Sequence, residues 1–470
     1  MQTVLLFVVG VLVALAGLIV SIALHEMGHL VPAKLFRVTV TQYMIGFGKT
    51  IFSRRHGETE YGVKWLPLGG YCAMVGMFPP EEGEGPGRDA STGFMQTMVQ
   101  EGSATGRAGH GGQAAVAAVA AQGLATGRPA SAAASPAAGG ERHPFYLLAP
   151  WKRIIVMLGG PVMNLVIAVA LFAIMFCGIG VQQYTTTVSA VSQCLKPATD
   201  TSQTCSAADL PSPAAAAGLR AGDRIESVDG VAVTGWDQLT RLIEARAGQS
   251  VPVVVARNGR DVTLSVTPEA SQNYVTNAQG DIVTGASGKP ETHTVGMIGI
   301  SPSTALVRQS FGAALNATGQ TVSGVVGVVV HLPQRLVGVW QAAFGPEKRA
   351  ADSPVGMIGI GRMAGDIAAS PVLPFVAKVQ TMLSLLASLN VALFIFNLVP
   401  LLPLDGGHVA GALWDEVRRG IAKLAGRRYP GPVDITRLMP LTMAVIVVLG
   451  GMSLLLAYAD IVKPVTLLGG

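Results

Sequence analysis

Two histidines and a glutamate occur together near the N-terminus, in the pentapeptide His25-Glu26-Met27-Gly28-His29. In a helix, residues four positions apart lie on one face, so His25 and His29 can present two imidazoles to a single metal ion. Zinc proteases use this spacing: the imidazoles bind Zn²⁺, and the glutamate accepts a proton from the water that the metal activates. The pentapeptide therefore predicts a zinc site with Glu26 as catalytic base.

The alternative is a chance pentapeptide whose polar groups are satisfied inside a helical bundle. The pentapeptide follows an apolar run from Val4 to Ala23, which is long enough to cross a bilayer. Ionisable residues in a membrane segment cost roughly 2.5 to 3.5 kcal/mol each on insertion scales, so three of them within five positions favour a functional site.

A catalytic zinc takes three protein ligands and leaves one position open, so a third ligand must come from elsewhere. Asp405 is the candidate, because Pro400 and Pro403 break an apolar helix just before it, and such a break is tolerated where the freed backbone lines a polar cavity. His408 follows closely, and we expect it to cap the helix or support a ligand, since Asp405 already completes the set.

The composition requires membrane-spanning elements to carry these residues. Half of the 470 residues are hydrophobic and only 13% are charged, against about 25% in soluble domains. Four apolar runs are long enough to span, at residues 4–30, 154–181, 376–402 and 436–462. The net charge of +5, without a basic cluster interleaved with aromatic residues, gives no support for nucleic-acid binding.

The basic residues indicate an orientation. Residues 31–153 carry twelve Lys and Arg, and residues 405–437 carry six, so the positive-inside rule puts both loops in the cytoplasm and both termini outside. Lys34 and Arg37 follow the histidines at once, which puts the histidines near the cytoplasmic face, at the depth of Asp405. The apolar stretch Val322 to Leu332 is too short to cross before Pro333, and we expect an interfacial or packed helix there.

The loop after the first span has two parts. Val38 to Met77 is rich in β-branched and aromatic residues punctuated by glycines, with a polar tip at Ser53 to Thr59, and predicts one or two hairpins. The hairpins either dip into the membrane, where an extended substrate can add a strand, or form an ordinary cytoplasmic element. Residues 79–143 are low in complexity, and we expect a disordered insert without a site.

The second span contains Gly159-Gly160-Pro161, which lets another backbone approach closely, followed by Asn164. Asn164 needs a polar partner within the membrane. It either helps to position the zinc site or bonds to a neighbouring helix.

Residues 186–270 predict a soluble mixed domain, with a strand at Thr187 to Val191, a helix at Trp236 to Ala245 and two strands joined at Asn258-Gly259. The run Ser212 to Gly230 resembles a PDZ domain, which accepts an extended peptide at a sheet edge. Cys194 and Cys205 bracket a short insert there and form either a disulfide, if outside the cytoplasm, or two free thiols.

The hexapeptide Val-Gly-Met-Ile-Gly-Ile occurs at Val295 to Ile300 and again at Val355 to Ile360. Neither copy has the context of a phosphate-binding loop, and six residues do not establish a repeat architecture.

Together, HExxH in a first span, Gly-Pro-x-x-Asn in a second, a PDZ-like region, and Asn-x-x-Pro…Leu-Asp-Gly-Gly-His in a later span resemble the site-2 protease family, in its RseP-like bacterial branch. The resemblance implies an intramembrane zinc endopeptidase with Zn²⁺ on His25, His29 and Asp405. It also implies that Asn397 holds the unwound substrate and that Val38 to Met77 is a membrane-reentrant hairpin. The second proline stands one place later than in the family pattern, and there is one PDZ-like region instead of two.

The implied partners are membrane lipid and single-pass membrane proteins, such as an anti-sigma factor trimmed outside the cell, and no nucleic acid. The alternative function is a non-proteolytic membrane-anchored PDZ adaptor or a transporter. The expected architecture is a polytopic α-helical protein of the cell membrane with about four transmembrane helices. Its segments are 1–37 (first span), 38–78 (hairpin region), 79–143 (insert), 151–182 (second span), 186–270 (PDZ), 271–375 (extracytoplasmic linker and amphipathic helix), 376–410 (third span), 411–435 (basic loop) and 436–462 (fourth span).

Overall fold

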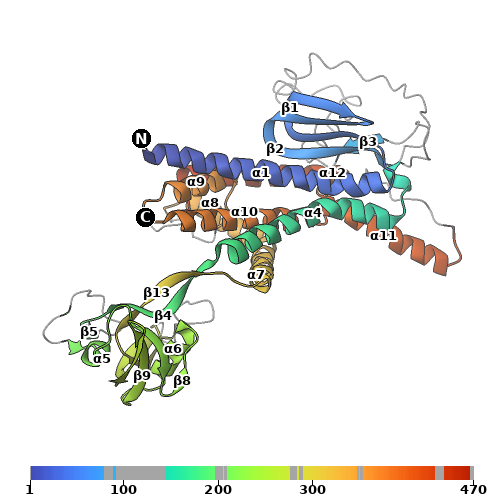
Figure 1. The fold of residues 1–470 in the computed structure, drawn as a ribbon. Coiled ribbons are helices and arrows are strands. Elements are labelled where there is room, and N and C mark those ends of the chain that lie inside the picture. The colour runs from blue at the N-terminus through green and yellow to red at the C-terminus, as the bar shows by residue number, and fades with distance from the viewer. Residues whose placement is uncertain are drawn as a thin grey trace. The chain divides into compact units, whose positions relative to one another are not determined.

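A computed structural model gives the fold of the chain (Figure 1). It describes residues 2–78, 88–91, 144–195, 205, 209–275, 283–284, 289–346, 349, 353–428 and 439–465. The chain forms two compact units, which are described separately below. Unit 1 comprises Met1–Gly178 and Ser310–Gly470, and unit 2 comprises Ile179–Gln309.

Unit 1 contains the four helices that the apolar runs predict. They are α1 (Gln2–Leu35), α4 (Pro150–Ala173, continued by a π-helical turn to Ile179), α10 (Phe375–Asn397) and α12 (Met439–Val462). Each is long and apolar enough to cross a membrane. The prediction of a polytopic helical membrane protein is confirmed to this extent.

A fifth helix of the described residues is also long and apolar enough to cross. This is α7 (Phe311–Val330), which covers most of the stretch where we expected a shorter interfacial or packed helix. The length argument against a span there was wrong, because the helix begins eleven residues before Val322 and reaches 20 residues. The polar residues Asn316, Thr318 and Thr321 lower the hydropathy of the first half of α7, so the evident apolar stretch begins only at Val322.

The helices of unit 1 approach each other closely at small residues. A Cβ atom on Gly28 of α1 would lie 2.2 Å from the carbonyl oxygen of Gly159 of α4, so only glycines permit this contact. On α10, the buried Asn390 amide donates a hydrogen bond to the Ser21 hydroxyl of α1 over 3.0 Å. Leu386 packs against Gly17, so α10 runs parallel to α1. α4 runs antiparallel to both.

The region Val38 to Met77 is an antiparallel hairpin of two long strands, β1 (Val40–His56) and β2 (Thr59–Phe78), as predicted. Both strands bend, because Gly46, Gly48 and Gly69 have positive φ angles of 90°, 85° and 137°. Each strand therefore pairs along two separate segments. Residues 40–45 lie between residues 70–74 on one side and residues 59–63 on the other, and residues 59–63 pair in turn with residues 52–56. The hairpin is therefore a four-stranded sheet.

The sheet has a further strand, β3 (Arg88–Ser91), which pairs with β2. These four residues belong to the segment expected to be disordered, so that expectation was wrong for them. Strand pairing offered by the edge of β2 orders a sequence with little apolar content of its own. The other residues of the predicted insert lie outside the described residues.

The hairpin sheet packs on the second half of α1. Its buried side chains share one core with α1 and α4, which includes Val40, Met74 and Val156. The Tyr43 hydroxyl donates a hydrogen bond to the carbonyl oxygen of Ala23 on α1 over 2.6 Å. The sheet is thus attached at the turn of α1 that precedes His25.

Unit 2 is a mixed α/β unit. Its main sheet has the strand order β10 (Arg260–Val266), β9 (Val251–Arg257), β7 (Arg224–Val228), β4 (Val181–Val191) and β13 (Ile300–Val307), and β8 (Val231–Ala232) pairs with β7. The expected strands, the turn at Asn258-Gly259 and the helix α6 (Trp236–Glu244) are present. The unit is wider than residues 186–270, because β13 pairs with β4, and β11 (Glu269–Tyr274) pairs with β12 (Thr292–Met297).

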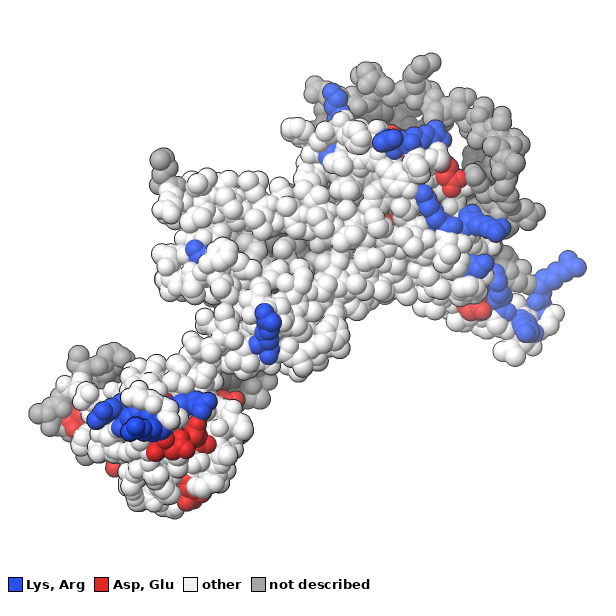
Figure 2. All heavy atoms as spheres, in the orientation of Figure 1, with Lys and Arg blue, Asp and Glu red and all other residues white. Residues whose placement is uncertain are grey.

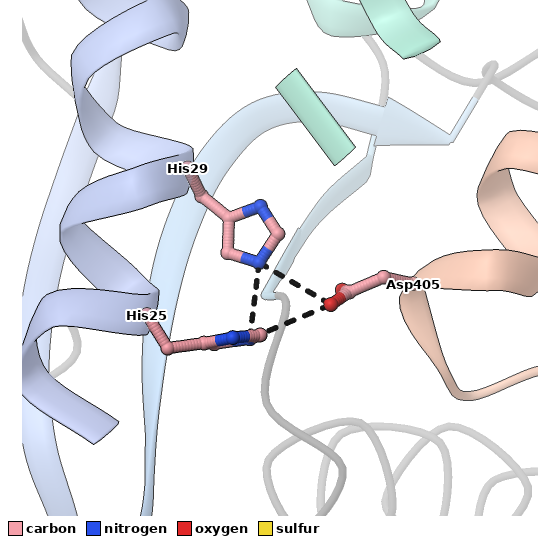
Figure 3. Close-up of side chains that lie close together, drawn as sticks. All are labelled: His25, His29 and Asp405. Atoms are coloured by element: carbon pink, nitrogen blue, oxygen red, sulfur yellow. Dashed lines mark hydrogen bonds and ion pairs between the residues drawn. The ribbon is translucent and has the colours of Figure 1, made fainter. Parts of the chain in front are cut away.

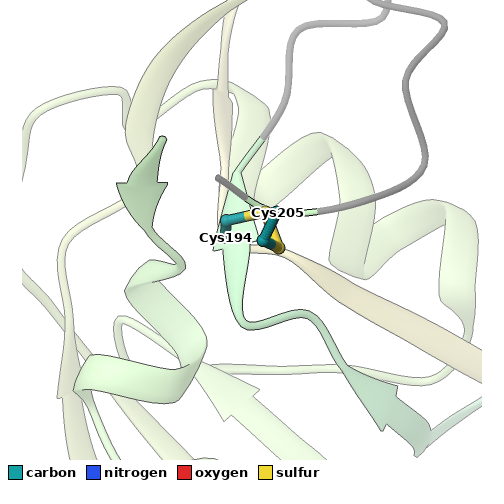
Figure 4. The surroundings of a disulfide bond; sticks show 2 residues. All are labelled: Cys194 and Cys205. Carbon is teal, nitrogen blue, oxygen red and sulfur yellow. A yellow bond between two sulfur atoms is a disulfide. The ribbon is translucent and has the colours of Figure 1, made fainter. Parts of the chain in front are cut away.

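Cys194 and Cys205 form a disulfide with a Cα–Cα distance of 5.8 Å (Figure 4). Of the two alternatives, the structure therefore contains the disulfide. Cys194 lies in the short strand β5 (Cys194–Leu195), which pairs with β6 (Leu210–Pro211), so the bond closes the loop between these two strands.

Two shorter helices, α8 (Leu332–Phe344) and α9 (Met357–Ala369), complete this part of unit 1. The buried carboxylate of Asp460, near the end of α12, accepts hydrogen bonds from the backbone N–H groups of Gly356 and Gly359, each over 2.9 Å. Arg349 donates to the other oxygen of the same carboxylate over 2.7 Å. The start of α9 is thereby attached to α12, while Gly10 and Gly365 bring α9 against α1.

Candidate metal centre

Three ligand atoms converge from two helices of unit 1 (Figure 3). The Nε2 atoms of His25 and His29 lie 3.3 Å apart, and each lies 3.4 Å from Oδ2 of Asp405. His29 and Asp405 are buried, and His25 is nearly so. The residues that the sequence predicts as a ligand set, 380 positions apart at their extremes, thus share one centre.

The triangle of ligand atoms has the dimensions of a zinc site. Tetrahedral coordination with bonds of about 2.0 to 2.1 Å separates neighbouring ligand atoms by about 3.3 to 3.4 Å. Oδ2 of Asp405 is buried and has no hydrogen-bond partner among the described residues. A buried carboxylate oxygen without a hydrogen bond is costly, and a cation at the centre of the triangle removes this cost. The residues therefore fit Zn²⁺.

The surroundings of His29 fix the proton on its ring. Nδ1 of His29 lies 2.8 Å from the carbonyl oxygen of Val156 on α4. A carbonyl oxygen only accepts, so Nδ1 must carry the hydrogen, and in the neutral imidazole Nε2 then presents its lone pair. This is the tautomer that binds a metal through Nε2, and α4 imposes it.

Asn164 of α4 holds His25 in the same way. Its amide lies 3.0 Å from Nδ1 of His25, and its other polar atom is buried without a partner. Because Nε2 of His25 faces the metal position, Nδ1 carries the proton, and a rotation of the amide by half a turn brings Oδ1 into position to accept it. Asn164 therefore contacts a predicted ligand, which favours the positioning role of the two alternatives, and that role stays a prediction.

Gly160 provides the space for both rings. A Cβ atom on this residue would lie 2.2 Å from Nε2 of His29 and 2.8 Å from Cε1 of His25. The Gly-Gly-Pro sequence had indicated a close approach of backbones, which holds for Gly159 against Gly28. Gly160 has a different role, since it leaves room for the ligands themselves.

Comparison with known proteins agrees with this geometry. The model of peptidase family M50 matches residues 13–435, which include all three ligands. The chain belongs to peptidase family M50. Zinc metalloprotease Rip1 of Mycobacterium tuberculosis (strain ATCC 25618 / H37Rv) is 31% identical over 98% of this chain and 99% of its own length. Rip1 of Mycolicibacterium smegmatis is 29% identical over 98% of this chain and 99% of its own length, and metalloprotease MmpA of Caulobacter vibrioides is 25% identical over 87% of this chain and 88% of its own length.

This M50 protease is accordingly a zinc metalloprotease. The loop between α10 and α11 holds Asp405, the predicted third ligand. Asp405 is the first residue of α11 (Asp405–Leu424). The chain between α10 and α11 folds back so tightly that a Cβ on Gly406 would lie 2.4 Å from the carbonyl oxygen of Val399. The Gly406-Gly407 pair thus allows the loop to pack on the first turn of α11.

α11 is also attached to α4. The buried guanidinium of Arg153 donates to Oδ2 of Asp415 over 2.5 Å, and both side chains are almost inaccessible to solvent. Arg153 lies about one turn before Val156 in α4. One helix that carries no predicted ligand therefore contacts His25, His29 and the helix of Asp405, through Asn164, Val156 and Arg153. Sequence reasoning missed Val156, because a backbone carbonyl leaves no signal, and missed the partnership of Arg153 with Asp415.

Glu26 is buried on α1 beside the two histidines. The hairpin comes close to it at Gly70, where a Cβ would lie 2.8 Å from Cγ of Glu26. The glycine lets β2 lie directly against the glutamate.

His408 lies one turn along α11 from Asp405. The triangle of ligand atoms does not include His408, so its role as a supporting residue stays a prediction.

Asn397 is the last residue of α10. The hydrogen bond between Ser21 and Asn390 places these two residues at the same level. Because α1 and α10 run parallel, Asn397, seven residues after Asn390, lies at the level of Gly28, seven residues after Ser21. Asn397 is thus at the depth of the ligands. Among the described residues it has no hydrogen bond to His25, His29 or Asp405.

Proposed function

We propose that this M50 protease is an intramembrane endopeptidase that hydrolyses peptide bonds within transmembrane segments of other membrane proteins. The observation that carries the proposal is the position of His25 beside the buried Glu26, His29 and Asp405, among helices long and apolar enough to span a bilayer. A metal centre that hydrolyses only soluble peptides does not need to lie among membrane-spanning helices.

The chain's own residues supply the proton transfers and the orientation. Zinc, when bound to His25, His29 and Asp405, lowers the pKa of water toward about 7 and polarises a carbonyl group. Glu26 accepts the proton from the attacking water and later gives it to the leaving amine. Val156 and Asn164 hold the two imidazoles in the orientation that presents Nε2 to the metal position.

A helical substrate must unwind before its peptide bonds can be attacked, because helical hydrogen bonds occupy its backbone. We infer that the unwound segment adds to the hairpin sheet as a further strand, supported by the close approach of Gly70 to Glu26. Asn397, at the depth of the ligands, donates to or accepts from the extended backbone. The hairpin then reaches into the membrane from the side of the metal centre.

We propose that the substrates are single-pass membrane proteins already trimmed outside the cell, an anti-sigma factor foremost. Unit 2 supports this as a PDZ domain: β13 is the last strand of the described sheet, and an extended peptide pairs with such an edge. The disulfide Cys194–Cys205 is typical of an oxidising compartment, which agrees with unit 2 outside the cytoplasm.

The proposed topology has four spans, with both termini outside the cytoplasm and the metal centre near the cytoplasmic face. The predicted ligands lie near the start of α4 and near the end of α10. The chain from Ile179 to Phe375, which joins the other ends of these two helices, therefore begins and ends on the same side of the membrane. A crossing by α7 would need a second crossing, and α8 and α9 have 13 residues each, about 20 Å, which is too short. This supports α7 as a helix that does not cross.

The decisive experiment compares Glu26→Gln with the wild type on a reporter transmembrane peptide, together with zinc analysis of the purified proteins. We expect cleavage to fall below detection while zinc remains bound, because Glu26 is no ligand. Glu244→Gln in unit 2 is the matched control. Full activity of Glu26→Gln would contradict the role of Glu26 as the base. Activity of the wild type on soluble peptides alone would contradict the proposal that the substrates are transmembrane segments.

The substrate is found by comparing membrane-protein fragments in cells that carry the wild type or Glu26→Gln. An anti-sigma factor fragment that accumulates only with Glu26→Gln supports the proposal, and accumulation of other proteins alone rejects it. The alternative of a non-proteolytic adaptor or transporter finds no support, since the ligand set is intact and the relatives are zinc metalloproteases.

A further inference from the structure

We propose that the outer face of α11 binds the anionic headgroups of membrane phospholipids, and that this contact goes beyond the proteolytic site. The second half of α11 has an exposed apolar stripe bordered by basic residues. The apolar members are Leu413, Trp414, Val417, Ile421 and Leu424, each at least half exposed.

These five residues lie on one side of the helix. At about 100° per residue, their spacing covers an arc of roughly 100°. The opposite side is buried and includes Ala412, Asp415 and Ala422. The stripe therefore faces away from α4 and is not part of the protein core.

The ion pair between Arg153 and Asp415 sets the depth of this stripe. It aligns Asp415 with the first turn of α4, where Trp151 is 55% exposed and Lys152 follows. Trp414, next to Asp415, is 56% exposed. Tryptophan and lysine at the end of an apolar helix mark the membrane interface. The two tryptophans thus indicate one interfacial layer, and the nine residues of α11 after Asp415 extend into the headgroup region.

The charges around the stripe identify the kind of lipid. From Glu416 to Arg428 the chain has one acidic residue and five basic ones. Lys423, Arg427 and Arg428 are exposed. Figure 2 shows basic side chains gathered at this end of unit 1, whereas the surface of the apolar helices is nearly free of charged residues. A row of basic residues beside an exposed apolar face is complementary to an anionic membrane surface.

The contact matters because α11 begins at Asp405. Lipid on the outer face and Arg153 on the inner face hold the same helix from two sides. The lipid surface is therefore a second support of the third ligand, in addition to the loop after Asn397.

The test uses the full-length protein in nanodiscs of phosphatidylcholine with phosphatidylglycerol, with bromine on the acyl chains of one lipid at a time. Bromine quenches nearby tryptophan, and the Trp414 signal is the difference between the wild type and Trp414→Phe. We expect Trp414 to be quenched severalfold more by brominated phosphatidylglycerol than by brominated phosphatidylcholine. In Lys423→Gln/Arg427→Gln/Arg428→Gln this preference disappears.

The control removes the same number of exposed charges from unit 2, in Arg220→Gln/Arg241→Gln/Arg260→Gln, and keeps the preference. Equal quenching by both lipids in the wild type overturns the anionic specificity. No quenching by either lipid, or cross-linking of α11 to another copy or another protein, overturns the membrane contact itself. None of these readouts depends on cleavage, so they are independent of the proposed proteolysis.

Discussion

Gly160 of α4 lies directly against the imidazole of His29, where a Cβ atom would come within 2.2 Å of Nε2. The His29 ring cannot move aside, because it is hydrogen-bonded to the carbonyl oxygen of Val156. The backbone of α4 cannot move aside either, because Gly159 of α4 is packed against Gly28 of α1. We expect Gly160→Ala to displace His29 and to reduce bound zinc to about a tenth or less of the wild-type content, by the usual sensitivity of metal sites to their surroundings. Metal analysis of the purified protein measures this.

Gly178→Ala is the control in the same helical segment, since a Cβ on Gly178 meets nothing within 4 Å. It is expected to keep its zinc. Normal zinc content in Gly160→Ala contradicts the close contact.

Asn164→Ala removes the acceptor that orients His25. We expect zinc affinity to fall about 10- to 100-fold, the usual effect of losing such a supporting bond. Asn164→Asp restores part of the affinity, because a carboxylate oxygen also accepts from Nδ1–H. Competition with a zinc chelator measures the affinities. Asn390→Ala, at an equally buried asparagine that bonds to Ser21, is the control and leaves zinc affinity unchanged; equal losses in both variants point to general loosening of the helices.

Asp415→Ala leaves the buried Arg153 guanidinium without its carboxylate. Removing one partner of a buried ion pair typically costs about 3 to 5 kcal/mol, and we expect a clearly lowered melting temperature in detergent. The double variant Arg153→Met/Asp415→Leu removes both charges and recovers most of the loss. A melting temperature of Asp415→Ala equal to that of the wild type indicates that the pair does not hold α11 to α4.

Unit 2 contains an ion pair with a predictable pH dependence. Arg257 donates to both carboxylate oxygens of the buried Asp223, over 2.8 and 2.7 Å, and these hydrogen bonds hold the pKa of Asp223 below its ordinary value of 3.8. A lowered folded-state pKa stabilises the fold above pH 3.8, and this stabilisation is lost as the pH falls through the lowered pKa.

Hydrogen exchange of the full-length protein therefore shows protection in unit 2 that declines below pH 3.8. Asp223→Asn has weaker protection at neutral pH and a flatter acid decline. Asp261→Asn, at an exposed position of β10, behaves like the wild type. An unchanged pH profile in Asp223→Asn contradicts the assignment.

The sequence by itself predicted the candidate ligand set and the apolar helices around it. HExxH needs only helical periodicity to place His25 and His29 on one face, and apolar runs of about 20 residues predict spans without knowledge of their neighbours. Asp405 also followed from the chain, because two prolines end the preceding helix at a known depth. In these cases the information is local, or is set by the fixed thickness of a membrane.

Tertiary contacts decided the rest. The two copies of Val-Gly-Met-Ile-Gly-Ile show this most clearly: the first ends β12 and begins β13 through Gly299, at a φ of 77°, whereas the second begins α9. In the helical copy, the N–H groups of Gly356 and Gly359 are bound by Asp460, which lies 104 and 101 residues further along the chain. The other copy has neighbouring strands to pair with. Likewise, Gly160, Val156 and the pair of Arg153 with Asp415 act through neighbours distant in sequence. Hydrogen-bond partners and free space belong to the packed structure, and one segment's residue types do not encode them.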